Sequence, residues 1–283
     1  LEFWRRECGG QSWKCRSRSP RFEDDIAGAD TFELEATVEE FVEYTKVTHR
    51  ADRKCCEESA VAYPRLGLED WRPFAGPLLQ LFAGCWDTLG PPGLRDSTAR
   101  WLGLFSEAFH IDPLEALAQY YQVSIGTTGT VSRLHTEGSN AHVWFNQIEG
   151  RRLFFLFPPQ EAKNLHAVSP RESPVDVFFP SAKRHPNFAE AKAHVAMLYL
   201  GQTLVVPSGW WWYSVVMEPS VTLVHRFYNR ENKVYFAEGL REHFDVQRAP
   251  GVSARMLALN VEQTYENIHQ QVVADEDSDL DDS

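Results

Sequence analysis

The stretch GQTLVVPSGWWWYSVVMEPSVTLVHRFYN, residues 201–229, carries the strongest fold signal in the chain. Its runs LVVP, WWWYSVV and SVTLVHRFY are short and rich in the β-branched and aromatic residues that favour strands, and Gly and Pro stand between them. Similar runs, YYQVSIG, AHVWFNQI and RRLFFLF, come earlier, from Tyr120 onward. Many short strands separated by turn residues predict a mainly β fold, a sandwich or a barrel, over this part of the chain.

Helical patterns flank the predicted β region on both sides. Thr37 and Glu40 form a capping-box pattern, and residues 97–110 and 112–119 have the apolar spacing or the capping residues of helices. Another helix is expected after about residue 237. Its apolar stripe, expected to pack on the β domain or to form a homodimer interface, consists of Leu257, Val261, Tyr265, Ile268 and Val272.

These patterns predict five parts along the chain. Residues 1–30 are expected to form a flexible basic segment, and residues 31–119 a helical extension. The β core is expected over 120–236, and a helical segment over 237–273. Residues 274–283 are rich in Asp and Glu, which repel one another, so a disordered acidic tail is expected there.

Composition limits the classes of partner and the compartment. The formal net charge of −12 argues against a protein whose main role is to bind phosphates. No run of ~20 apolar residues and no signal-peptide pattern is present, so no membrane contact is expected and a cytoplasmic or nuclear location follows by elimination. The five cysteines form no C-x-x-C pair, and free thiols in a reducing compartment are expected.

The first candidate for metal chemistry is the H-x-E pattern of His135 and Glu137 in LHTEG. On a strand, residues two apart project from the same face, so the imidazole and the carboxylate point into one space. Such a pair supplies two ligands of the facial triad that holds non-haem iron. Alone, the pattern also fits two polar residues at an exposed strand end.

The surrounding motifs carry a family resemblance. SRLHTEG (132–138), RRLFFLFPPQEA (151–162) and the stretch 201–229 occur in the order found in the Jumonji-C (JmjC) domain proteins, which the chain resembles over residues 120–230. Fainter similarity reaches residues 62–78. That family consists of iron(II)- and 2-oxoglutarate-dependent oxygenases, and the chain looks most like its hydroxylase-type branch. The resemblance implies a double-stranded β-helix (jelly-roll, cupin-like) core with flanking α-helices.

The resemblance also assigns residue roles. It implies that His135 and Glu137 hold Fe(II), and that the hydroxyl of Ser132 hydrogen-bonds 2-oxoglutarate. Arg152 matches the position where most members carry a Lys that binds the far carboxylate of 2-oxoglutarate. Arg suits this role, because it binds a carboxylate in a bidentate manner. Tyr63 is a looser match to a tyrosine that also reaches this carboxylate.

The third iron ligand is missing from the expected position. The family sequence P-x-G-W-W-H ends in a ligating His, and that position is Trp212 here. Indole nitrogen is a donor only and cannot bind a metal. A substitute could come from His225, if a hairpin at Met217–Ser220 paired it with Trp212. The alternation of the strand argues against this, because it puts His225 and Arg226 on opposite faces. The resemblance implies that the face of Arg226 looks into the pocket.

Two functions from different classes follow. The first is a dioxygenase that uses Fe(II) and 2-oxoglutarate to hydroxylate or demethylate a substrate. A protein or peptide substrate is favoured by the acidic composition, with RNA or a small molecule as alternatives. The second is a catalytically inactive domain, in which Trp212 fills the space of the ion and the groove binds a protein or peptide.

Overall fold

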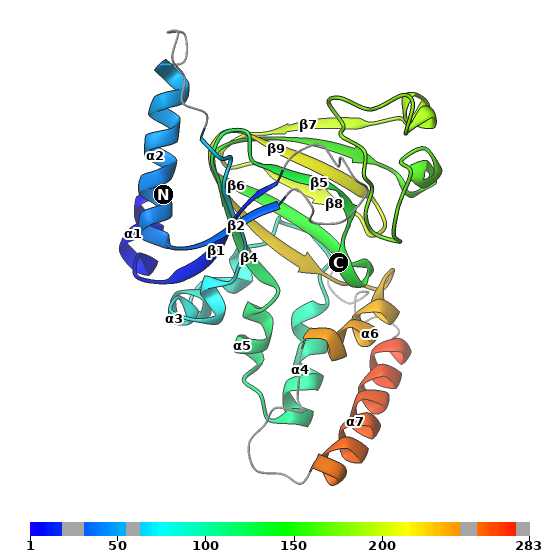
Figure 1. Cartoon of the computed structure of the whole chain (residues 1–283). Helices are drawn as coiled ribbons and strands as arrows, with labels where there is room; N and C mark the ends of the chain where they lie inside the picture. The colour runs from blue at the N-terminus through cyan, green and yellow to red at the C-terminus, as the bar shows by residue number, and fades with distance from the viewer. Residues whose placement is uncertain (19–30, 55–62, 244–253, 276–283) are drawn as a thin grey trace.

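The computed structural model describes residues 1–18, 31–54, 63–243 and 254–275. Its strands form a nine-stranded antiparallel arrangement in the order β2-β1-β3-β4-β9-β6-β7, with β5 added to β9 and β8 added to β6 (Figure 1). The strands are β1 (Ser12–Arg18), β2 (Thr31–Thr37), β3 (Gly67–Trp71), β4 (Tyr121–Gly126), β5 (Val131–Thr136), β6 (His142–Phe157), β7 (His194–Leu198), β8 (Thr203–Val206) and β9 (Trp211–Phe227).

Two long strands, β6 and β9, belong to both faces of a jelly roll. The first half of β6 pairs with β8 and the second half of β9, which in turn pairs with β4. The second half of β6 pairs with β7 and the first half of β9, which in turn pairs with β5. The strands therefore form two sheets joined through β6 and β9. The predicted mainly β, jelly-roll, cupin-like core is confirmed.

The bend that carries β6 and β9 from one sheet to the other is built by Gly150 and Pro219. Register shifts interrupt the β6–β9 ladder around Gly150, whose φ is +71°. A Cβ at Gly150 would lie 2.1 Å from the carbonyl oxygen of Pro219, so only glycine fits there. The hairpin at Met217–Ser220, on which His225 as a substitute ligand depended, does not form, because β9 runs through these residues as one strand.

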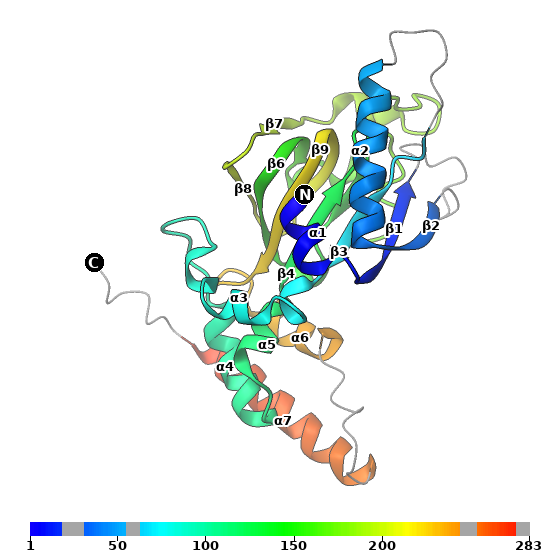
Figure 2. The same ribbon diagram turned by 90° about the vertical axis from the view of Figure 1, so that its left-hand side faces the viewer.

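Helices cover the outside of one sheet and one end of the barrel. They are α1 (Glu2–Cys8), α2 (Val38–Lys54), α3 (Leu79–Ala83), α4 (Thr98–Phe109), α5 (Pro113–Ala118), α6 (Lys233–His243) and α7 (Ala254–Ala274). Figures 1 and 2 show α4 to α7 gathered at one end of the barrel, with α1 and α2 beside it. None of the described helices is both long enough and apolar enough to cross a bilayer.

The apolar core has a separate part inside the barrel. A large cluster joins the helices to the outer face of one sheet, and a second lies under the loops of residues 159–190 on the other sheet. Between the sheets, Trp212 packs with Phe145 and Phe154 in a smaller cluster. Trp212 therefore points into the interior of the barrel, as its position in the family motif predicts.

The N-terminal predictions need correction. Residues 1–18 were expected to be flexible, yet they form α1 and β1, and β1 pairs with both β2 and β3. The extension over residues 31–119 is helical only in part, since β2 and β3 add to the main sheet. Apolar burial explains the order of the first segment, because Trp4, Cys8 and Cys15 enter the core. Residues 19–30 lie outside the described part.

The C-terminal helix packs within the chain. Tyr265, Ile268 and Val272 are buried, and the ring of Tyr265 lies 5.2 Å from that of Phe109 on α4. A homodimer through α7 would therefore need a different face of this helix. Of the predicted acidic tail, Ala274 ends α7 and Asp275 accepts a 2.7 Å hydrogen bond from the indole of Trp101. Residues 276–283, and the side chains of Leu257 and Val261, lie outside the described part.

Candidate ligand site inside the barrel

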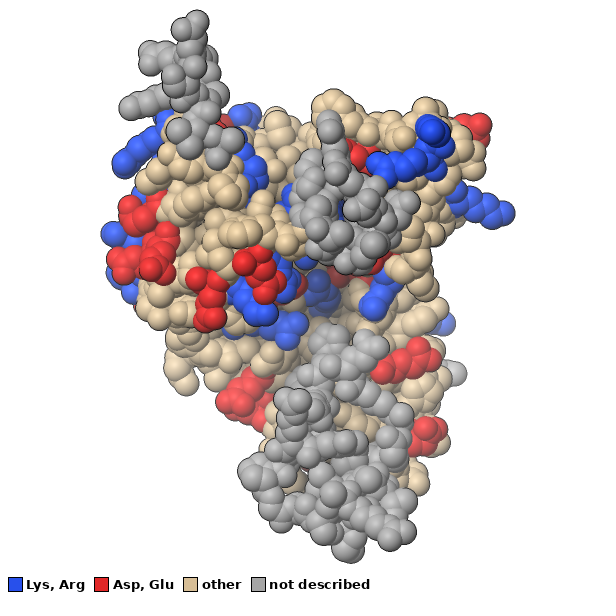
Figure 3. Space-filling model, viewed as in Figure 1, with Lys and Arg blue, Asp and Glu red and all other residues tan. Residues whose placement is uncertain are grey.

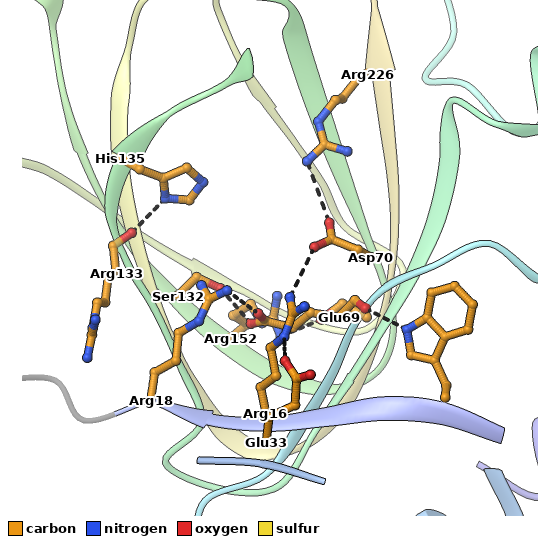
Figure 4. A network of polar contacts seen from close by, with 12 residues as sticks. Arg16, Arg18, Glu33, Glu69, Asp70, Ser132, Arg133, His135, Arg152 and Arg226 are labelled. Atoms are coloured by element: carbon orange, nitrogen blue, oxygen red, sulfur yellow. Dashed lines mark hydrogen bonds and ion pairs between the residues drawn. The ribbon is translucent and has the colours of Figure 1, made fainter. Parts of the chain in front are cut away.

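A cavity of about 460 Å³ lies inside the barrel and is bordered by β1 and β3. Four carboxylates line it, and so do five arginines, namely Arg16, Arg18, Arg133, Arg152 and Arg226. Figure 4 shows part of this network. On the outer face drawn in Figure 3, acidic and basic side chains are mixed among the coloured atoms. Arginines from β1, β5, β6 and β9 thus gather at this cavity.

The structure brings His135 and Glu137 to the same cavity, as the H-x-E spacing predicts. His135 lies on β5 opposite Trp212 on β9, and the two rings are 4.2 Å apart. Its Nδ1 is 2.6 Å from the carbonyl oxygen of Arg133. Because a carbonyl only accepts, Nδ1 carries the proton of this hydrogen bond. The ring orientation is thus fixed by the backbone of β5 itself.

Both carboxylate oxygens of Glu137 are engaged by donors from β9. Trp212 Nε1 donates to Oε1 over 3.1 Å, and Arg226 Nε donates to Oε2 over 2.5 Å. The Glu137 side chain is only 4% exposed and that of Arg226 is 24% exposed. Burial raises the pKa of Glu137, but the charges of Arg226 and His135 and the two hydrogen bonds outweigh it and hold that pKa below 4.5.

These residues do not fit an iron centre. A facial triad needs a third ligand and a carboxylate oxygen that is free to bind the ion. Trp212 supplies no lone pair, and the Arg226 guanidinium bonds the carboxylate that the ion would need. Over the described residues, no group of three His, Cys, Asp or Glu side chains is arranged to hold a metal. The positive charge beside Glu137 comes from the protein.

His225 does not replace the missing ligand. It lies on the second half of β9, where it pairs with Tyr121 of β4 and Trp144 of β6. Its Nε2 is 2.8 Å from a carboxylate oxygen of Asp96, and its ring stacks on Tyr121 at 3.9 Å. His225 therefore joins β9 to the chain ahead of α4, outside the cavity.

The opposite part of the cavity contains Arg152 and Ser132, as the resemblance implies. Arg152 is 3% exposed and donates a 3.0 Å hydrogen bond to the hydroxyl of Ser124. Its Nε has no hydrogen-bond partner, and no described carboxylate forms an ion pair with it. Burial lowers the pKa of Arg152 to about 10, although the nearby charge of Glu69 opposes this shift. Arg152 therefore stays charged at neutral pH.

Tyr63 is not brought to the cavity. It lies just before β3 in contact with Tyr44 of α2, at a ring distance of 6.4 Å, and does not line the cavity. Sequence reasoning missed Glu69 and Asp70 of β3 and Arg16 and Arg18 of β1, which do line it. The basic character of the N-terminal segment was the available signal, but nothing in its spacing indicated a strand beside the cavity.

Comparison with known proteins identifies the class of protein. Residues 18–234 match the family described as a cupin-like domain. This match covers most of the chain and includes both long strands and all the residues that line the cavity except Arg16. The chain belongs to the cupin-like family of JmjC type.

The similar curated proteins have different names and are longer. HSPB1-associated protein 1 of Rattus norvegicus is 31% identical over 113 residues, 38% of this chain and 23% of that protein. Lysine-specific demethylase JMJ21 of Arabidopsis thaliana is 29% identical over 139 residues, 46% of this chain and 15% of that protein. JmjC domain-containing histone demethylation protein 1 of Caenorhabditis briggsae is 25% identical over 186 residues, 64% of this chain and 16% of that protein. The matched segments span less than a quarter of each of these relatives.

Proposed function

We propose that this chain is a ligand-binding member of the cupin-like family that does not carry out iron-dependent oxidation. The observation that carries the proposal is the arrangement at Glu137, where Trp212 and Arg226 bond one carboxylate oxygen each. A dioxygenase that hydroxylates or demethylates a substrate would need this carboxylate for Fe(II). In this chain a guanidinium already neutralises it.

Electrostatic repulsion explains why the Arg226 guanidinium and a metal ion cannot both bind Glu137. A buried carboxylate needs a positive partner, and Arg226 supplies one at 2.5 Å. An ion bound to His135 and Glu137 would lie beside the Arg226 guanidinium. Two unit charges 4 Å apart repel by about 4 kcal/mol at an effective dielectric constant of about 20, and a divalent ion doubles this. Metal binding would therefore first have to displace Arg226.

The ligand we propose is a carboxylate-bearing small molecule of the 2-oxoglutarate type. The support is the buried guanidinium of Arg152, which faces the cavity with one nitrogen unbonded. A buried charge without a charged partner is costly, and an arriving carboxylate would neutralise it. Ser124 and Ser132 line the same part of the cavity and offer hydroxyl donors.

A protein partner is a second candidate function. HSPB1-associated protein 1, a relative by sequence, is named for association with a protein. A catalytically inactive domain could retain such a role on its outer surface, because binding there does not require the iron ligands. The support for a protein partner is only the relative's name, whereas the support for a carboxylate ligand comes from the residues that line the cavity.

The proposal is tested by titrating the protein with Fe(II) and 2-oxoglutarate without oxygen, and then admitting air. The natural chain is expected to show no metal-to-ligand charge-transfer band and no consumption of 2-oxoglutarate. The double variant Trp212→His/Arg226→Val, which adds a ligand and releases Glu137, is expected to bind Fe(II).

Trp212→His alone is the matched control, and it is expected to bind iron far more weakly because Arg226 still holds Glu137. A charge-transfer band together with turnover in the natural chain would refute the proposal.

A further inference from the structure

A bulge in β3 turns two successive acidic residues toward the cavity. The ladder between β3 and β4 shifts register between Leu68 and Trp71, and the intervening residues are Glu69 and Asp70. In a regular strand, neighbouring side chains point to opposite faces, but a bulge removes this alternation. Asp70 has a φ of +55°, a left-handed conformation that is strained for a residue other than glycine. Both side chains line the cavity as a result.

The two acidic side chains have different partners. Asp70 lies between Arg16 of β1 and Arg226 of β9, at 3.8 and 3.9 Å. Glu69 is 15% exposed, accepts a hydrogen bond of 3.3 Å from Ser132 Oγ, and lies 3.6 Å from Arg18 of β1. Figure 4 shows its carboxylate among Ser132, Arg152 and Arg18. The Glu69 backbone is also held, because its carbonyl accepts a 3.0 Å hydrogen bond from Trp13 Nε1.

We propose that Glu69 is a specificity-determining residue of this site: its carboxylate competes with the ligand's carboxylate for Ser132 and for the charge of Arg152. This inference rests on the proposed function. Glu69 already accepts the hydrogen bond that Ser132 has available for a ligand. It is also the acidic side chain whose charge acts on Arg152. A carboxylate ligand must therefore bind close to a fixed negative charge.

Competition between Glu69 and a ligand carboxylate limits how tightly the cavity can bind a dicarboxylate. A ligand whose carboxylate reaches Arg152 has to break the Ser132–Glu69 hydrogen bond and turn Glu69 toward Arg18. Since Arg18 belongs to β1, ligand binding is coupled to the N-terminal strand. The site therefore binds a dicarboxylate weakly as long as Glu69 keeps its charge, and more tightly once that charge is removed.

The test measures the dissociation constant of 2-oxoglutarate by calorimetry in a metal-free buffer containing EDTA. Glu69→Gln keeps the size of the side chain and its ability to accept from Ser132, but removes the charge. It is expected to bind 2-oxoglutarate about tenfold more tightly than the natural chain, because the repulsion between the Glu69 carboxylate and the ligand carboxylate is relieved.

Glu33→Gln is the matched control, since Glu33 of β2 pairs with Arg16 of β1 but does not line the cavity. Its affinity is expected to stay within about twofold of the natural chain. A melting temperature for each variant shows that it is folded, and 2-oxoglutarate is expected to raise that of Glu69→Gln more than that of the natural chain.

Two results separate this inference from the proposed function. If the natural chain binds 2-oxoglutarate, Arg152→Met abolishes binding, and Glu69→Gln does not tighten it, then the role of Glu69 is wrong and the proposed site stands. If neither the natural chain nor Glu69→Gln binds 2-oxoglutarate, the carboxylate site is wrong and the role of Glu69 with it.

Discussion

The two parts of the cavity differ in how completely the chain satisfies its own charges. Around Glu137, both carboxylate oxygens are bonded, one by Trp212 and one by Arg226. Around Arg152, the buried guanidinium has one neutral partner, Ser124, and one nitrogen without a partner. A buried charge that the protein itself neutralises stabilises the fold but leaves no charge for a ligand to bind. A buried charge without an ionic partner costs stability but can bind a ligand of opposite charge. The jelly roll retains both kinds of site within one interior.

The largest expected effect on stability tests the part of the cavity around Glu137, where the protein neutralises its own charge. Arg226→Met is expected to lower the free energy of unfolding by about 3–5 kcal/mol, because it leaves Glu137 buried without a cation. Chemical denaturation of both proteins measures this difference.

The matched control for that prediction is Arg151→Met. Arg151 pairs with Glu218 at 2.6 Å, but the two side chains are 43% and 46% exposed. Water screens such a pair, so a loss of only about 0–1 kcal/mol is expected. Equal losses of stability in the two variants would show that the Arg226–Glu137 ion pair contributes no more than an exposed ion pair.

The next effect separates the cavity from the outside of the barrel. His225→Ala is expected to cost about 2–4 kcal/mol of stability, since it empties a buried site and removes the partner of Asp96 Oδ2. The affinity for 2-oxoglutarate is expected to stay unchanged. A variant that folds normally but loses this affinity would place His225 in the site after all.

Acidification is expected to weaken the part around Glu137. Its folded pKa lies below 4.5, so its contribution to stability is complete above the unfolded value and is lost as the pH falls through the folded pKa. The unfolding free energy of the natural chain should therefore fall more steeply with acid than that of Glu137→Gln. Urea denaturation between about pH 5 and pH 3 measures both slopes. Parallel slopes would contradict the assigned ion pair.

The smallest expected effect on stability tests the part of the cavity around Arg152, whose charge has no ionic partner. Arg152→Met is expected to leave the unfolding free energy unchanged or to raise it by up to about 1 kcal/mol, because a buried charge with no ionic partner is replaced by an apolar chain of similar length. The same variant is expected to lose affinity for 2-oxoglutarate in calorimetry. A large loss of stability would mean that Arg152 is a structural residue.

The fold could be predicted from sequence because its signals are local. The β-branched and aromatic runs mark the core strands, and the motif around Trp212 places the indole inside the barrel, where it is found. Strand alternation put Arg226 and His225 on opposite faces, the family resemblance turned the face of Arg226 inward, and both orientations agree with the structure.

The remaining features depend on contacts that sequence spacing does not encode. The bend of β9 at Pro219 looks like a turn unless its pairing along the whole of β6 is known. The bulge at Glu69 and the addition of β1 to β3 are long-range pairings of the same kind. The strand pattern and the family resemblance placed Arg226 at the cavity. Its hydrogen bond to Glu137, 89 residues away, depends on the three-dimensional fold.

The most direct test is a crystal grown with Mn(II) in place of Fe(II), together with 2-oxoglutarate, and measured for anomalous scattering. The central claim is that the chain supplies the positive charge beside Glu137. The expected map shows the Arg226 guanidinium bonded to that carboxylate and no anomalous peak between His135 and Glu137. A peak coordinated by both residues, with Arg226 turned away, would contradict it.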